Sequence, residues 1–233
     1  MVVPSDALLN AGTIDSAPWR LAVLTSAPDR RVTAAIATVA DAAAQHGFEL
    51  VATFVAQGAD LAAAPELSSI TRIRSIPMLT LDPRIHRTSG PSWRQRYERI
   101  VIDTLTPFRP EIVLLLGYGL IAGPTLLAAW PMVNVHPAVP GGRVGTERAL
   151  IDELIATGAP TTGVMSHLVT EDLDAGPVIA SVEIAIPPPE RTWPRRNPRR
   201  VIAELHGQVL EPLLVETLQR LADELGSRPR VSA

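Results

Sequence analysis

Short apolar runs alternate along the chain with longer stretches whose apolar positions have helical spacing. Arg20–Ser26 is an apolar run with polar ends, which is typical of a buried strand. Residues 34–47 have helical spacing and end in glycine, and Phe48–Ala56 is again a compact apolar run. A strand, a helix and a strand in this order indicate a parallel sheet with right-handed crossovers.

The same alternation continues downstream. Ser92–Pro110 has helical spacing and ends in prolines, and Glu111–Gly117 is the most apolar run and predicts a central strand. We also expect a short helix within 118–131, strands at 132–136, 161–169 and 177–186, and helices at 147–156 and 201–225. These elements predict an α/β fold: a Rossmann-like, mostly parallel twisted sheet with helices on both faces. Ligands of such sheets bind beyond the carboxyl ends of the strands.

Four segments are expected along the chain. Residues 1–18 are polar and without period and predict a flexible leader, and 19–186 form the catalytic domain. Residues 187–200 are a loop of Pro and Arg, interpreted as a solvated connector with an anion-binding role as the alternative, and 201–233 contain a helix that packs back on the domain. Neither a signal peptide nor an apolar run of about 18 residues is found, so we expect a cytoplasmic protein that does not contact a membrane.

Composition removes several kinds of chemistry. The chain has no cysteine, which excludes disulfides, thiolate zinc sites and a cysteine nucleophile. It has no lysine either, so all 21 basic residues are arginine and a Schiff-base lysine is excluded. A net charge of −3 gives no bulk attraction for nucleic acid, and we expect none as a partner.

Two polar clusters are the candidates for chemistry. Asn134 and His136 lie two residues apart at the end of a predicted strand, so their side chains share a face, while Val133 and Val135 face the other way. Alone, such a pair more often caps a strand or completes a core. The second cluster is the segment from His167 to Pro177, whose turn contains the acids Glu171, Asp172 and Asp174. An amide, an imidazole and an acid that converge on one pocket would suit acyl transfer.

The order of these blocks resembles the folate-dependent formyltransferases, the family of the glycinamide ribonucleotide and methionyl-tRNA enzymes. The blocks are N-x-H-P, a glycine about nine residues further on, and a T-G-x-x-x-H-x-V strand that leads into E-D-x-D-x-G-P, and the resemblance covers about Arg20 to Ile186. It implies that Asn134, His136 and Asp174 form the catalytic trio and that His167 is an auxiliary residue. It also implies a pterin-binding backbone at 117–124 and 169–174, with these candidates: Tyr118, Leu120, Ile121, Ala122, Val169, Thr170, Glu171 and Asp172.

The resemblance implies direct formyl transfer from 10-formyltetrahydrofolate to an acceptor amine, through a tetrahedral intermediate and without a metal. Asn134 and His136 would donate hydrogen bonds to the developing oxyanion. Asp174 would favour protonated His136 and relay the proton of the amine through water.

The sequence departs from the family on the acceptor side. The stretch after the first strand, TSAPDRRV, lacks the glycine that a phosphate-cradling loop needs, and the chain ends after one helix, which argues against a tRNA acceptor. The segment after Gly142 is shortened, and Arg143 and Arg148 at its edge are candidates for pairing with an anionic acceptor. By elimination we expect a small amine from secondary metabolism, such as an amino sugar or a hydroxylamine-bearing amino acid.

Other interpretations remain open at this point. The same trio would serve a formyltetrahydrofolate hydrolase, or the chain would be a catalytically altered folate-binding paralogue. In a third alternative His136, His167 and Asp174 would hold a non-haem metal. We expect structural roles for His46, His86 and His206 and packing roles for Trp93, Trp130 and Trp193. The largely apolar last helix is compatible with a homodimer.

Overall fold

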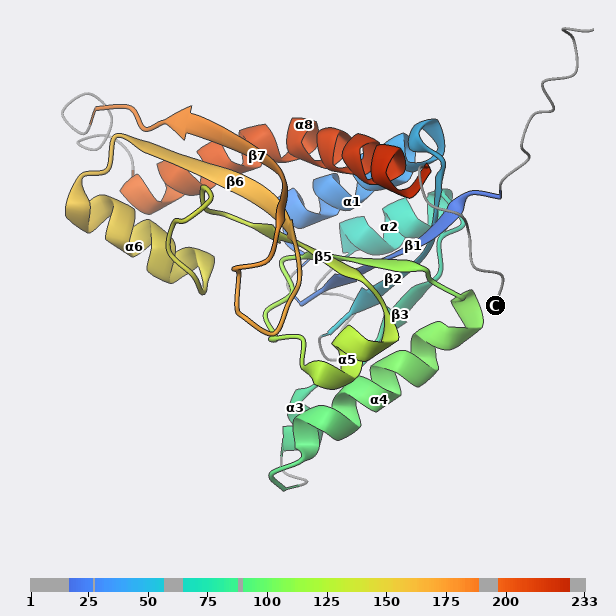
Figure 1. The fold of residues 1–233 in the computed structure, drawn as a ribbon. Helices are drawn as coiled ribbons and strands as arrows, with labels where there is room; N and C mark the ends of the chain where they lie inside the picture. The colour runs from blue at the N-terminus through green and yellow to red at the C-terminus, as the bar shows by residue number, and fades with distance from the viewer. Residues whose placement is uncertain (1–16, 27, 57–64, 88–89, 189–196, 227–233) are drawn as a thin grey trace, which may run out of the picture.

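The computed structural model describes residues 17–26, 28–56, 65–87, 90–188 and 197–226, and its centre is a seven-stranded sheet (Figure 1). The strand order is β3-β2-β1-β4-β5-β6-β7. The strands are β1 (Trp19–Thr25), β2 (Phe48–Val55), β3 (Met78–Thr80), β4 (Ile112–Leu116), β5 (Met132–His136), β6 (Thr161–Leu168) and β7 (Val178–Ala185). The first five run parallel, whereas β6 and β7 are antiparallel to their neighbours. The expected α/β fold with a mostly parallel sheet is confirmed.

Helices cover both faces of the sheet (Figure 1). They are α1 (Arg30–Ala43), α2 (Pro65–Ile73), α3 (Arg84–Arg87), α4 (Trp93–Leu105), α5 (Pro124–Ala129), α6 (Glu147–Thr157) and α8 (Pro198–Gly226), with 3-10 turns at Ala44–His46 and Thr106–Phe108. The alternation of strand side chains assigns the faces: Leu21 and Val23 of β1 pack in the cluster with α1 and α8, and Ala22 and Leu24 pack in the cluster with α4 and α5.

Helix α8 closes the fold along the sheet (Figure 1). Its buried side chains include Leu213 and Val209, which pack on Val164 of β6 and Ala180 of β7, and its last turns reach the cluster beside α1. The helix begins at Pro198, inside the segment expected to be a loop, because proline is well suited to the first turn of a helix. Residues 189–196 of that loop, with Trp193, and residues 1–16 of the expected leader lie outside the described residues.

Most elements lie where the sequence predicts them, but three in the middle of the chain were not predicted. The stretch between β2 and α4 contains α2, the three-residue β3 and the four-residue α3. Strands and helices of this length span too few residues to show a period. His86, expected in a loop, lies on α3, and its ring is 5.6 Å from that of Tyr97.

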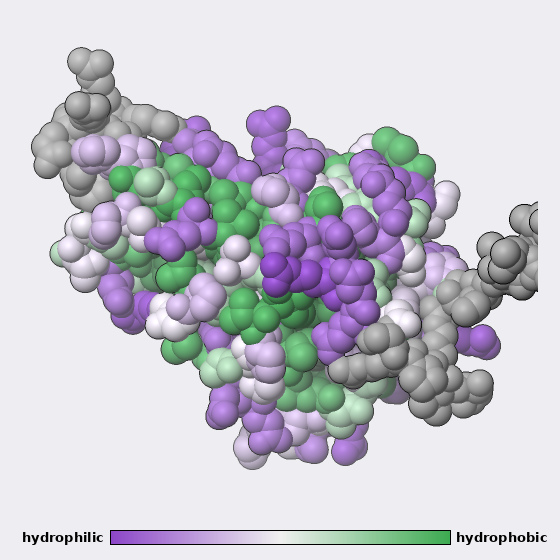
Figure 2. All heavy atoms as spheres, turned by 45° about the horizontal axis from the view of Figure 1, so that its top comes forward, coloured by the Kyte–Doolittle hydropathy of each residue, from purple (hydrophilic) through white to green (hydrophobic). Residues whose placement is uncertain are grey.

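The surface mixes polar and apolar side chains. On the face shown in Figure 2, hydrophobic residues are exposed in the central part, between hydrophilic side chains. Six large hydrophobic residues are exposed among those described. Four of them come from segments next to the carboxyl ends of β4 and β5, from the turn before β7 or from the first position of β7: Ile121, Val144, Leu173 and Val178. No helix among the described residues is long and apolar enough to cross a membrane.

Candidate active site

Strand β5 places Asn134 and His136 at its carboxyl end, with Val133 packed in the core on the opposite face, as the two-residue spacing predicts. The antiparallel pairing of β5 with β6 sets Asn134 directly opposite His167. Thus a strand that runs against the rest of the sheet brings a histidine, 33 residues further along the chain, beside the amide.

The turn after β6 brings Asp174 to the same place. Gly176 lies so close to β6 that a Cβ added there would be 1.8 Å from the carbonyl oxygen of Leu168, so only glycine lets the turn fold back at this point. Asp174 itself has a φ of 52°, in the left-handed region that aspartate tolerates better than most residues. Turn geometry therefore determines where the carboxylate points.

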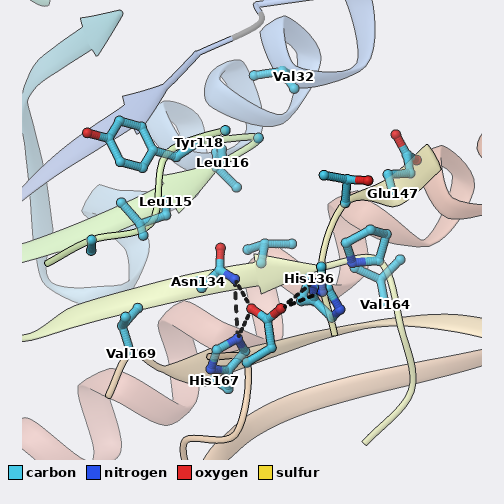
Figure 3. Close-up of a pocket in the computed structure, with 18 of the residues that line it drawn as sticks. Val32, Leu115, Leu116, Tyr118, Asn134, His136, Glu147, Val164, His167 and Val169 are labelled. Carbon is cyan, nitrogen blue, oxygen red and sulfur yellow. Dashed lines mark hydrogen bonds and ion pairs between the residues drawn. The ribbon is translucent and has the colours of Figure 1, made fainter. Parts of the chain in front are cut away.

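Asn134, His167 and Asp174 form one hydrogen-bonded group (Figure 3). The amide Nδ2 of Asn134 donates to Asp174 Oδ1 at 3.2 Å and lies 3.2 Å from Nε2 of His167. Nδ1 of His167 donates to the carbonyl oxygen of Leu168, so Nε2 is the acceptor in the neutral ring. Both amide hydrogens of Asn134 are thereby engaged, and its carbonyl oxygen points away from His167 (Figure 3).

His136 joins this group from the other side. Its Nδ1 lies 3.6 Å from Asp174 Oδ2, and its Nε2 donates to the backbone carbonyl of Arg143 at 2.9 Å. The backbone N–H of Gly145 donates to the same Asp174 oxygen at 3.1 Å. The segment after β5 thus contacts both an imidazole and the carboxylate.

Asp174 is ionised near neutral pH. Burial alone would raise the pKa of its carboxyl group, but the attraction of the His167 ring, whose Nε2 lies 3.6 Å from Oδ1, the hydrogen bond from the N–H of Gly145 and the nearby imidazole of His136 outweigh burial and lower the pKa below its usual value. The side chains of Asp174, His136 and His167 are 7%, 4% and 2% exposed. The group is therefore an almost buried carboxylate between two imidazoles.

These side chains line one cavity of about 430 Å³, a size typical of small-molecule sites. It includes all four residues of the predicted catalytic and auxiliary set. Of the residues expected to hold the pterin, seven line the cavity and Asp172 does not; the seven are Tyr118, Leu120, Ile121, Ala122, Val169, Thr170 and Glu171. Segments 117–122 after β4 and 169–174 after β6 thus form two of its walls.

Comparisons with known proteins show the family of this chain. Residues 21–206 match the formyl transferase family, which is most of the chain. The chain belongs to this family. Phosphoribosylglycinamide formyltransferase of Bacillus subtilis is 27% identical over 126 residues, which cover 52% of this chain and 61% of that protein. Methionyl-tRNA formyltransferase of Nitratidesulfovibrio vulgaris is 31% identical over 152 residues, which cover 64% of this chain and 42% of that protein.

The fold of this chain is also similar to that of a solved structure. The crystal structure of phosphoribosylglycinamide formyltransferase from Bacillus halodurans superposes with a TM-score of 0.70 at 26% identity, over 88% of this chain and 96% of that one. The matched sequence spans less than two thirds of the length of each of the two relatives named above.

Sequence reasoning missed a second polar group that lines the cavity. Asp29, Arg31, Glu147 and His206 all lie on its wall. His206 was expected to be structural; its Nε2 lies 2.8 Å from Thr162 Oγ1 and its Nδ1 3.3 Å from Glu147 Oε1. Asp29 could have been found, since a polar residue at the end of the first strand and the start of a helix lies at the ligand-binding edge of an α/β sheet.

The cavity wall formed by segment 117–122 is held in place by α4. Glu98 of α4 is 3% exposed, and its carboxylate accepts a hydrogen bond of 2.6 Å from the backbone N–H of Gly123. A Cβ on Gly123 would be 2.5 Å from this carboxylate, so the approach requires glycine. A buried carboxylate thereby holds the end of segment 117–123 in place.

The two predicted acceptor arginines are not on the cavity wall among the described residues. The guanidinium of Arg143 pairs with Glu153 of α6, and only its backbone carbonyl reaches the site. Arg148 is exposed on α6. Their acceptor role stays a prediction, and the lining gives it no support. Within the described part of the chain, no three His, Asp or Glu side chains are grouped so that they could hold a metal ion.

Proposed function

We propose that this chain transfers the formyl group of 10-formyltetrahydrofolate to the amine of a small-molecule acceptor. The observation that carries the proposal is the convergence of Asn134, His136 and an ionised Asp174 in one cavity, next to the segments expected to hold a pterin. Family membership supports formyl transfer as the reaction class. No metal takes part in the proposed steps.

The chemistry needs hydrogen-bond donors for an oxyanion and a group that accepts a proton from the amine. The lone pair of the amine forms a bond to the formyl carbon, and the carbonyl π pair moves to oxygen. Collapse of this intermediate re-forms the carbonyl and breaks the bond to N10, which takes a proton, while the amine loses one. Donors for the oxyanion lower the barrier, and losing one such donor typically costs roughly 3 to 4 kcal/mol. An ionised Asp174 accepts the proton from the amine, directly or through water.

Both proposed donors are hydrogen-bonded within the protein before substrate arrives. His136 would exchange the carbonyl of Arg143 for the formyl oxygen. Asn134 turns its carbonyl oxygen to the cavity while Asp174 is ionised, because a carboxylate accepts from the amide NH₂. In this orientation Asn134 would accept a hydrogen bond from the attacking amine. Protonation of Asp174 would free the amide to turn and donate to the oxyanion.

Replacing Asp174 by asparagine tests the proposal. Asp174→Asn keeps the shape of the side chain but removes the charge and the proton acceptor, so single-turnover release of tetrahydrofolate, measured with a panel of amines, should slow by roughly 10²–10⁴-fold. Binding of a non-transferable folate analogue should change less than the rate. Glu183→Gln, which neutralises an exposed acid of β7 away from the cavity, is the matched control.

Two results would contradict the proposal. If Asp174→Asn releases tetrahydrofolate at close to the wild-type rate, the carboxylate is not needed for transfer. A wild-type protein that binds the folate analogue but transfers formyl to no amine would instead be the folate-binding paralogue, and release with water alone would make it a hydrolase.

The wider setting is part of the same proposal. We expect a small molecule rather than nucleic acid as acceptor, although relatives include methionyl-tRNA formyltransferases. The proposed setting is cytoplasmic and in secondary metabolism. A homodimer remains a prediction that sedimentation of the purified protein would test.

A further inference from the structure

The charged lining of the cavity is mostly acidic. Five residues with full charges line the cavity among those described: four carboxylates and one guanidinium, namely Asp29, Glu147, Glu171, Asp174 and Arg31. Because like charges repel most strongly where water is scarce, such a lining disfavours an anionic ligand. Figure 3 shows Glu147 on α6 and Val32 on α1, across the cavity from His167 and Val169.

The one cation of this lining has no hydrogen-bond donor to spare. Arg31 makes five hydrogen bonds with its five N–H groups. Two go to Asp29 Oδ2 at 3.4 and 3.2 Å, two go to the carboxylate of Glu147 at 2.9 and 3.1 Å, and one goes to the carbonyl oxygen of Ala203 at 3.0 Å. A phosphate or carboxylate of a ligand would have to displace one of these internal partners.

The start of α1 is occupied in the same way. The first N–H groups of a helix attract anions, and helix starts after the first strand of an α/β sheet often hold phosphate. Here Oδ1 of Asp29 accepts from the backbone N–H groups of Arg31 and Val32, both at 2.9 Å. A carboxylate of the protein thus fills the place that a phosphate would take.

Glu147 has acceptor capacity left toward the cavity. Burial alone would raise the pKa of its carboxyl group, but the bonds to His206 and Arg31 outweigh burial and lower the pKa to about 2, so the group is ionised. Its side chain remains 33% exposed. A carboxylate accepts about four hydrogen bonds, more than Arg31 and His206 supply.

We propose that Asp29, Arg31 and Glu147 determine acceptor specificity: the part of the acceptor amine that lies against α1 and α6 carries hydroxyl groups or a second amine, and no phosphate or carboxylate. The inference rests on the proposed function and names the substrate class of that site. An unphosphorylated amino sugar or another hydroxylated amine fits this chemistry, whereas its phosphorylated form does not.

The first test measures binding of inorganic phosphate and needs no folate or formyl transfer. Asp29→Gly removes the internal carboxylate, and glycine is well tolerated where a helix begins. In a titration followed by the backbone amide NMR signals of residues 31 and 32, the wild type should show no saturable shift, whereas the variant should bind phosphate at least tenfold more tightly. Wild-type affinity within threefold of that of the glycine variant would overturn the proposal.

A second variant keeps the test decisive if the glycine variant does not fold. Asp29→Asn removes the charge but retains a good helix cap, so it should fold as the wild type does and bind phosphate at least threefold more tightly. An asparagine variant indistinguishable from the wild type would also overturn the proposal.

The second test uses transfer itself, with glucosamine and glucosamine 6-phosphate as a matched pair of acceptors. The wild type should prefer glucosamine by at least tenfold in kcat/KM, and Asp29→Gly should lower this preference. A wild type that prefers the phosphorylated sugar would overturn the specificity proposal. Transfer to neither sugar would contradict glucosamine-like acceptors. Transfer to no amine at all would contradict the proposed function. In that case the phosphate titration would still decide the role of Asp29.

Discussion

Replacing Glu147 by glutamine should reduce the stability of the protein at neutral pH and remove part of its dependence on acid. The carboxylate accepts two hydrogen bonds from Arg31 and lies 3.3 Å from the ring of His206. Glutamine keeps the shape and one acceptor oxygen but cannot ionise. The change therefore removes the charge of one residue and little of its packing.

The magnitude follows from the pKa of Glu147, which the fold lowers from 4.5 to about 2. At about 1.4 kcal/mol per pKa unit this difference corresponds to about 3 kcal/mol. Because the side chain is 33% exposed, water screens the pair, and we expect about 1 to 2 kcal/mol. A carboxyl group whose pKa is lower in the folded than in the unfolded protein stabilises the fold at any pH above its unfolded pKa. The contribution of Glu147 is therefore lost as the pH falls from about 4.5 toward 2, and roughly half of it is lost by pH 3.

Urea unfolding at pH 6 and pH 3 measures this contribution. The free energy of unfolding of the wild type should fall between the two conditions by about 1 kcal/mol more than that of Glu147→Gln. Glu153→Gln on the same helix is the matched control, since Glu153 forms a more exposed pair with Arg143 and such pairs contribute little. Equal losses in the wild type and Glu147→Gln would refute the assignment of the lowered pKa to this network.

Two further changes test the walls of the site. Gly176→Ala would place a methyl group 1.8 Å from the carbonyl oxygen of Leu168, so thermal unfolding should show a loss of at least about 2 kcal/mol; an unchanged Tm would mean that the turn can move away. Glu98→Ala leaves the N–H of Gly123 without its acceptor and should weaken the binding of a folate analogue by about 1 to 3 kcal/mol. Glu98→Gln keeps an acceptor oxygen and should retain most of the affinity. Equal affinities of the two variants in a binding titration would contradict the anchoring role of Glu98.

The sequence predicts the long elements of the fold well, because each has enough residues to show its period. The last helix differs from its expected start by three residues. Met132–His136 has only five residues, but the following proline marks its end. Periodicity does not show in which direction a strand runs within the sheet. β6 and β7 are strands in either orientation, yet only the antiparallel pairing of β6 with β5 sets His167 opposite Asn134.

The candidate site divides in a similar way. Asn134, His136 and Asp174 are found from motif spacing, since each belongs to a block that recurs in a known family. Arg31 and Glu147 are 116 residues apart, and each alone resembles an ordinary helix-surface charge. Nothing local in the sequence shows that α1 and α6 meet at one cavity, because their contact depends on the order in which the strands join the sheet.

The segment between β5 and α6 links the two halves of the cavity. The carbonyl of Arg143 accepts from His136 and the N–H of Gly145 donates to Asp174, two residues before Glu147 begins α6. An acceptor bound to Glu147 thus acts on a segment whose next hydrogen bonds position both proposed catalytic groups. Small errors in the position of a reacting group cost large factors in rate, so an acceptor that fits this wall would also set the imidazole and the carboxylate. Selection of the acceptor and the rate of transfer should therefore change together when this segment is altered.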